Sequence, residues 1–106
     1  KEYFGETLTM DELQKIVWAR IPHFYNSPYY VYQYATGFSA AVAISSRIMK
    51  GEEGALEGYK KFLSGGCSMT PIELLRLCGV DMSTTRPVDE ALSFFGELLD
   101  EFEGQR

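Results

Sequence analysis

The final segment of this chain places apolar side chains at intervals of three and four residues, and no other feature constrains the fold as strongly. Residues with this spacing fall on one face of an α-helix, so the segment from Pro87 onward is predicted to be an amphipathic helix. Pro87 suits its first turn, because the N–H that proline lacks has no helical partner there. The apolar positions of this predicted helix are Val88, Ala91, Leu92, Phe95, Leu98, Leu99 and Phe102.

Start and stop signals for two further helices flank the middle of the chain. Thr9–Glu12 and Thr70–Glu73 both have the spacing of a capping box, in which the threonine hydroxyl and the glutamate carboxylate bind backbone N–H groups. The first predicts a helix over about 9–20, which Pro22 ends. The second predicts a short helix that Gly79 closes.

Between these segments the sequence predicts a long helix and a shorter one. Ser27 and Pro28 suit the N-cap and the first position of a helix that runs to Lys50. A shorter helix is expected over about 53–63, ahead of Gly65 and Gly66. Its predicted buried positions are Leu56, Tyr59, Phe62 and Leu63. Because no segment alternates convincingly as a strand, we predict an all-α domain of about five helices packed as an irregular bundle.

Charge and hydropathy exclude several functional classes. The 10 Lys and Arg residues against 15 Asp and Glu give a net charge of −5, which disfavours nucleic-acid binding. The most apolar stretch, 31–48, contains Gln33 and Arg47 and is too polar to span a bilayer, so no membrane partner is expected. The spacing of Cys67 and Cys78 fits neither a zinc motif nor a redox motif. Together with the absence of a signal-like segment, this leads us to expect a cytoplasmic protein.

The only histidine, His23, is followed closely by five tyrosines, at positions 25, 29, 30, 32 and 34. A tyrosine ring is apolar, but its O–H needs a partner when it is buried. Tyr29 and Tyr32 are three residues apart, which on a helix would place them on one face. An imidazole and one or two phenols that converge can donate hydrogen bonds to an oxyanion, each worth on the order of 3 kcal/mol. The alternative is that these rings are ordinary core residues with satisfied hydroxyls.

The chain lacks the residues for a complete catalytic centre of its own. It has one histidine and no HExxH motif, so we expect no zinc site built by this chain alone. Nucleophilic catalysis would need a serine or cysteine beside His23, and nothing in the sequence brings one there.

Several separated segments of the sequence occur in a specific order: Trp18–Tyr25, Tyr30–Ala41, Tyr59–Gly66, Pro71–Leu75 and Gly79–Met82. In this order they closely resemble the C-terminal region of oligoendopeptidase F, a zinc metallopeptidase of the thimet-oligopeptidase type in family M3. The resemblance covers about residues 8–103. It implies that the chain is the C-terminal part of a larger helical peptidase that hydrolyses short peptides.

The resemblance also implies that the metal-binding residues and the oxyanion-stabilising residues come from different parts of the enzyme. In that family an HExxH helix supplies two zinc-binding histidines and the general base, and we expect it upstream of Lys1. Residues 1–106 would then form one wall of the active-site cleft. His23 would hydrogen-bond the substrate backbone or the oxyanion, and Tyr32 would donate its O–H to the same oxyanion. Tyr25, Tyr29 and Tyr30 would line the cleft and bind substrate, and zinc would be held only in the parent enzyme.

Two other functions remain open from the residues alone. One is a free-standing helical module whose tyrosine-lined pocket binds a peptide or small ligand, and the other is a structural helical domain. An HExxH upstream of Lys1 would favour the peptidase. For the peptidase segment in isolation we expect no catalysis, a need for the remainder of the catalytic domain as its partner, and self-association through uncovered apolar surface.

Overall fold

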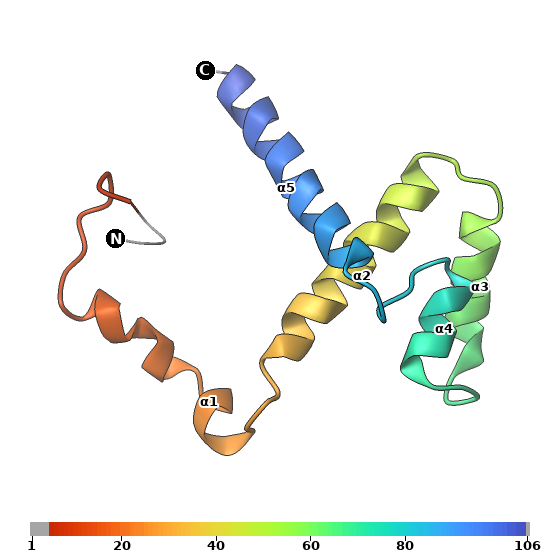
Figure 1. Ribbon diagram of the computed structural model, residues 1–106, viewed down its shortest axis with the longest axis horizontal. Coiled ribbons are helices and arrows are strands. Elements are labelled where there is room, and N and C mark those ends of the chain that lie inside the picture. The colour runs from red at the N-terminus through yellow and green to blue at the C-terminus, as the bar shows by residue number, and fades with distance from the viewer. Residues whose placement is uncertain (1–4, 106) are drawn as a thin grey trace. The chain divides into compact units, whose positions relative to one another are not determined.

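The computed structural model describes residues 5–105, and every regular element within that range is helical (Figure 1). The elements are the 3-10 helix η1 (Gln14–Arg20) and the α-helices α1 (His23–Asn26), α2 (Tyr32–Met49), α3 (Ala55–Gly65), α4 (Pro71–Leu77) and α5 (Arg86–Gly104). The predicted all-α class is therefore confirmed. Contacts divide the chain into two compact units, one up to Tyr32 and one from Gln33 onward. Within the described range, no helix combines the length and apolar character needed to cross a bilayer.

The second unit has a buried core centred on α2. Ala43 at 1% exposure and Val80 at 3% are its most deeply buried members, and Ala40, Ile44 and Cys78 complete it. The half-buried side chains packed against this core are Ile48, Tyr59, Phe62, Leu75 and Met82. Small side chains on α2 thus meet larger ones from α3, α4 and the loop that follows, as close packing requires.

Helices α3 and α4 lie side by side in the second unit (Figure 1). Their close approach depends on Gly58, since a methyl group there would overlap the Leu77 carbonyl. The Cys78 thiol lies 3.8 Å from the Gly58 carbonyl oxygen and so belongs to the same contact between α3 and the end of α4. α3 therefore buries the face that carries Ala55 and Gly58.

The predicted buried face of α3 is partly wrong. Tyr59 and Phe62 do pack against the core, and their rings stack with centroids 6.3 Å apart. Leu56 and Leu63, by contrast, are 51% and 62% exposed. The spacing of apolar residues predicts one face of α3. The contact of Gly58 with Leu77 determines that α4 packs against the side of α3 that carries Gly58, which leaves Leu56 and Leu63 exposed.

The capping box predicted at the start of α4 is present. The Thr70 hydroxyl accepts a hydrogen bond from the Glu73 N–H at 3.4 Å, and the Glu73 carboxylate accepts one from the Thr70 N–H at 2.9 Å. Hydrogen bonds from the Thr70 side chain and backbone lower the pKa of Glu73 below its usual value. At the other end Gly79 has a φ of 73°, the left-handed conformation expected after a helix.

Arg47 of α2 holds the loop after α4. Its Nη1 donates to the Cys78 carbonyl oxygen at 3.0 Å, and its Nε donates to the Glu52 carboxylate at 2.7 Å. The guanidinium occupies the space where any side chain at position 79 would lie. Gly79 is thus required both for its backbone conformation and for this contact.

Helix α5 matches the predicted closing helix, with Pro87 in its first turn. Only Pro87 and Ala91 of this helix are buried. The apolar side chains that periodicity predicted for this helix are largely exposed, since Leu92, Phe95 and Phe102 are 64%, 59% and 59% exposed. Among the described residues, the α5 side chains of Leu92 and Phe95 therefore remain more than half exposed.

The helix predicted over about 9–20 begins later than expected. Asp11 Oδ1 accepts from the Gln14 N–H at 2.9 Å, and the 3-10 helix η1 starts at that residue. The Glu12 carboxylate bonds Lys15 at 2.6 Å. The capping box predicted at Thr9 is therefore wrong, because the Asp11 side chain accepts a hydrogen bond from the Gln14 N–H and the helix begins further along the chain.

Candidate functional site

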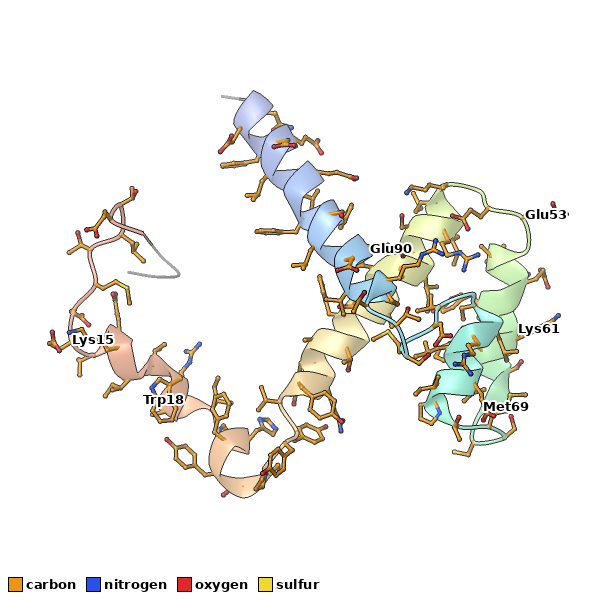
Figure 2. All side chains as sticks on the ribbon, in the orientation of Figure 1. Lys15, Trp18, Glu53, Lys61, Met69 and Glu90 are labelled. Atoms are coloured by element: carbon orange, nitrogen blue, oxygen red, sulfur yellow. The ribbon has the colours of Figure 1, made fainter. Side chains whose placement is uncertain are left out.

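The residues assigned to the site from the sequence (His23, Tyr25, Tyr29, Tyr30 and Tyr32) lie in the first unit, between the end of η1 and the first residue of α2. Figure 2 shows aromatic side chains gathered around α1 and the turn that follows it. No residue from 5 to 32 is buried, so the rings are held by contacts with one another and by local backbone hydrogen bonds.

The long helix predicted from Pro28 starts instead at Tyr32, and a tight turn takes the place of its first residues. The Ser27 carbonyl accepts from the Tyr30 N–H at 3.2 Å, with Pro28 and Tyr29 between them. Tyr29 has a φ of 62°, the left-handed value that the third residue of a type II turn requires. Proline suits both the second turn position and the first helical position, so the N-cap assigned to Ser27 was wrong.

His23 is the first residue of α1 and is half-buried. Its imidazole stacks on the Tyr30 ring, with centroids 5.4 Å apart and planes 16° apart. The turn at Pro28 and Tyr29 allows this contact, because it reverses the chain between the two rings. Tyr30 is 41% exposed, less than Tyr25, Tyr29 or Tyr32.

Tyr25 is held by a residue that the sequence reasoning did not single out. Its ring stacks on Trp18 of η1 with centroids 6.5 Å apart and planes 24° apart. Phe24 meets the same indole edge-on at 6.2 Å and 75°. Trp18, labelled in Figure 2, therefore links η1 to α1. As the only tryptophan of the chain, placed shortly before Pro22, it could have been recognised as an anchor.

Tyr29 and Tyr32 are not neighbours on one helix face. Tyr29 lies in the turn and is 94% exposed, whereas Tyr32 is the first residue of α2 and is 61% exposed. The predicted pairing is wrong because only one of the two residues is helical.

The chemistry available in this segment is hydrogen-bond donation. Tyrosine offers an O–H and imidazole an N–H. Tyr25, Tyr29 and Tyr32 are each more than half exposed, so a ligand can reach them. Such donors stabilise negative charge that develops on an oxygen atom.

The described residues do not fit a metal centre. Between residues 5 and 105 no three His, Cys, Asp or Glu side chains gather closely enough to hold an ion. Since zinc in proteins takes three or four such ligands, a zinc site would need ligands from elsewhere.

A separate cavity of about 450 Å³ lies within the second unit, between α2 and α5. Its charged lining residues are Arg47, Lys50, Glu52, Arg86, Asp89, Glu90 and Glu97. Two ion pairs, Arg47–Glu52 and Arg86–Glu90, each at 2.7 Å, already satisfy part of this charge. It contains neither tyrosine nor histidine, so it is not the tyrosine-lined pocket considered for a binding module.

Comparison with known proteins identifies related sequences along most of the chain. The family described as Peptidase family M3 matches residues 1–94. Oligopeptidase PepF of Bacillus subtilis is 48% identical over 103 residues, which is 97% of this chain and 15% of that protein. An oligoendopeptidase F homolog of Borreliella burgdorferi is 44% identical over 95% of this chain and 17% of its own length.

Group B oligopeptidase PepB of Streptococcus agalactiae is 41% identical over 97% of this chain and 17% of its own length. The chain thus spans only 15–17% of the length of these three relatives. No solved structure matches it significantly.

Proposed function

Since the chain belongs to peptidase family M3, we propose that it is the C-terminal helical part of the catalytic domain of an oligoendopeptidase F-type enzyme that hydrolyses short peptides in the cytoplasm. The observation that carries this proposal is the 48% identity to an oligopeptidase that extends over 97% of the chain. Because residues 5–105 offer no metal-ligand cluster, the zinc ligands and the general base are assigned to the remainder of the enzyme.

Within that enzyme, His23 and Tyr32 are assigned to charge stabilisation. Hydrolysis of a peptide bond builds negative charge on the carbonyl oxygen, and an imidazole N–H and a phenol O–H are suitable donors to it. The half-buried position of His23 and the 61% exposure of Tyr32 support this role, because neither ring is enclosed by its own chain.

Tyr25, Tyr29 and Tyr30 are assigned to the wall that contacts substrate. Their rings present both apolar surface and a polar tip, which suits a peptide with mixed side chains. Their exposed fractions of 59%, 94% and 41% are consistent with a surface that is covered only when substrate or the rest of the enzyme is present.

The remainder of the catalytic domain is the proposed partner of the uncovered face of α5. The exposed fractions of Leu92 and Phe95 support this, since an apolar stripe of that kind normally lies against another element. The isolated chain should therefore self-associate, be inactive toward peptides and retain no zinc. Zinc-dependent turnover by the 106-residue chain alone would contradict this assignment.

The test of the proposed function is Tyr32→Phe in the full-length enzyme that contains this segment. The change removes one hydroxyl and keeps the ring, so folding should be unaffected. Loss of one oxyanion donor predicts a fall in kcat of roughly 100-fold or more. Steady-state kinetics on a short peptide and an unfolding curve measure the two properties.

Tyr34→Phe is the matched control. It deletes a hydroxyl from a ring of similar exposure, 58%, two positions further along α2. Its kcat should stay within about twofold of the parent enzyme. Equal kcat values for Tyr32→Phe and the parent enzyme would refute the role assigned to Tyr32.

A further inference from the structure

We infer that Tyr30 is a positioning residue that acts through His23: its ring fixes the plane of the imidazole that serves as oxyanion donor. This inference rests on the proposed function and separates Tyr30 from the other tyrosines of the segment. The observation behind it is the stacked contact between the two rings, 5.4 Å between centroids and 16° between planes.

The geometry suits orientation of the imidazole, and the 41% of the Tyr30 surface that stays exposed is left for the proposed substrate contact. Offset-stacked aromatic rings have centroids about 4.5–7 Å apart, and this pair falls in that range. The contact uses the face of the imidazole, whereas both ring nitrogens lie in the ring plane. Tyr30 can therefore restrict rotation of the His23 ring without occupying the atoms that would donate to substrate.

The backbone conformation that places Tyr30 against His23 is energetically unfavourable at Tyr29. A residue other than glycine in the left-handed region is disfavoured by roughly 1–2 kcal/mol, and Tyr29 adopts φ of 62°. Together with the hydrogen bond from the Tyr30 N–H to the Ser27 carbonyl, this conformation turns the chain back toward α1. Tyr30 is accordingly the least exposed of the four tyrosines assigned to the site.

The other stacked pair of the segment shows that this arrangement is specific to His23. Tyr25 stacks on Trp18, and neither ring carries a group that the proposed mechanism places on the oxyanion. Of these two stacked pairs, the pair of Tyr30 and His23 is the one that includes a donor of the proposed reaction. A donor that is oriented before the reaction contributes more to transition-state stabilisation than one that must be ordered during it.

The experiment compares Tyr30→Leu and Tyr30→Phe in the full-length enzyme. Phenylalanine keeps the stacked ring, so its kcat should fall clearly less than that of the leucine variant, and any substrate contact made by the Tyr30 hydroxyl should appear as a change in KM. Leucine removes the ring, and loss of an aromatic pair corresponds to roughly a three- to tenfold decrease in kcat, whereas loss of a substrate contact by the same ring would appear in KM. Phe24→Leu is the matched control, because it removes a neighbouring ring that contacts Trp18 rather than His23. Its kcat should match that of the parent enzyme.

A double-mutant cycle tests whether Tyr30 acts through His23. Adding Tyr30→Leu to His23→Ala should produce no further decrease in kcat, because the ring to be positioned is gone. A full additional decrease in that background would overturn the inference. So would a Tyr30→Phe variant as slow as Tyr30→Leu, since the hydroxyl would then be the important group.

The same set of variants separates this inference from the function on which it rests. If His23→Ala lowers kcat strongly and Tyr30→Leu does not, the positioning role fails while the proposed function stands. If His23→Ala leaves kcat unchanged, the oxyanion role of His23 fails, and the role of Tyr30 fails with it. Unfolding curves for each variant identify any loss of activity that comes from misfolding.

Discussion

The two units of this chain are stabilised in different ways. From residue 5 to Tyr32 no side chain is buried, and local contacts define the structure: the hydrogen bond from the Gln14 N–H to Asp11, the turn at Tyr29 and stacked ring pairs. From Gln33 onward a buried core joins residues that are distant in sequence. The proposed donors and substrate-binding rings belong to the first kind of region. Rings that must meet a ligand cannot also be the buried core, so short-range contacts have to orient them.

Gly58→Ala should give the largest loss of stability. The added methyl group would meet the Leu77 backbone carbonyl, which cannot rotate away as a side chain could. Overpacking of this kind costs typically 1–3 kcal/mol, and the rigid neighbour favours the upper end. Urea unfolding of the 106-residue chain measures the effect.

Gly37→Ala is the control, because no atom lies near a methyl group at that position of α2. Alanine has the higher helix propensity, so this variant should be more stable by up to about 1 kcal/mol. If both alanine variants were equally stable, the close approach of α3 to α4 at Gly58 would not contribute to the stability of the second unit.

Arg47→Met should produce a smaller but clear loss. The side chain donates to the Cys78 carbonyl and to Glu52, and hydrogen bonds to a charged group are worth roughly 1.5–3 kcal/mol. Arg86→Met is its matched control, because the Arg86 side chain is 83% exposed and forms its ion pair with Glu90 on the same helix. Removal of such a surface pair should cost less than about 1 kcal/mol. Equal urea midpoints for the two methionine variants would show that Arg47 does not hold the loop.

Asp81 should give the smallest effect, visible only in acid. Hydrogen bonds from the Ser83 side chain and backbone, followed by one from the Arg76 side chain, lower its pKa from 3.8 to about 2. The folded state therefore binds fewer protons than the unfolded state between these values, and stability decreases as the pH falls through them. Urea midpoints measured from pH 3.8 down to about 2 should fall less steeply for Asp81→Asn.

Ser83→Ala removes the hydroxyl that donates to Asp81 at 2.6 Å and should give an intermediate slope. If the slopes of the parent chain and Asp81→Asn coincided, another group would be responsible for the acid sensitivity of the second unit.

The two predicted capping boxes show how far local patterns can be trusted. Thr70–Glu73 forms the expected box, with Pro71 holding the first turn in helical geometry. Thr9–Glu12 has the same spacing, yet Asp11 bonds the backbone of Gln14 and the helix starts there. The pattern records which bonds are possible, whereas competition among neighbouring polar side chains decides which of them forms.

The candidate site was predictable to a similar extent. The composition around His23 marked the segment as rich in hydrogen-bonding rings, and the order of separated motifs indicated the peptidase family that the comparisons confirm. The pairing of those rings was not predictable. Pro28 is equally compatible with a helix start and a turn, and only the turn brings Tyr30 onto His23.

The amino-acid sequence by itself determined the helical class, the N-terminal cap of α4 at Thr70, the end of that helix at Gly79 and the family. Each depends on neighbours along the chain or on a pattern shared with relatives. Only the tertiary structure decided which helix faces are buried and which rings meet. Those outcomes depend on contacts such as that of Arg47 with Cys78, 31 residues apart, whose formation depends on how the whole chain packs.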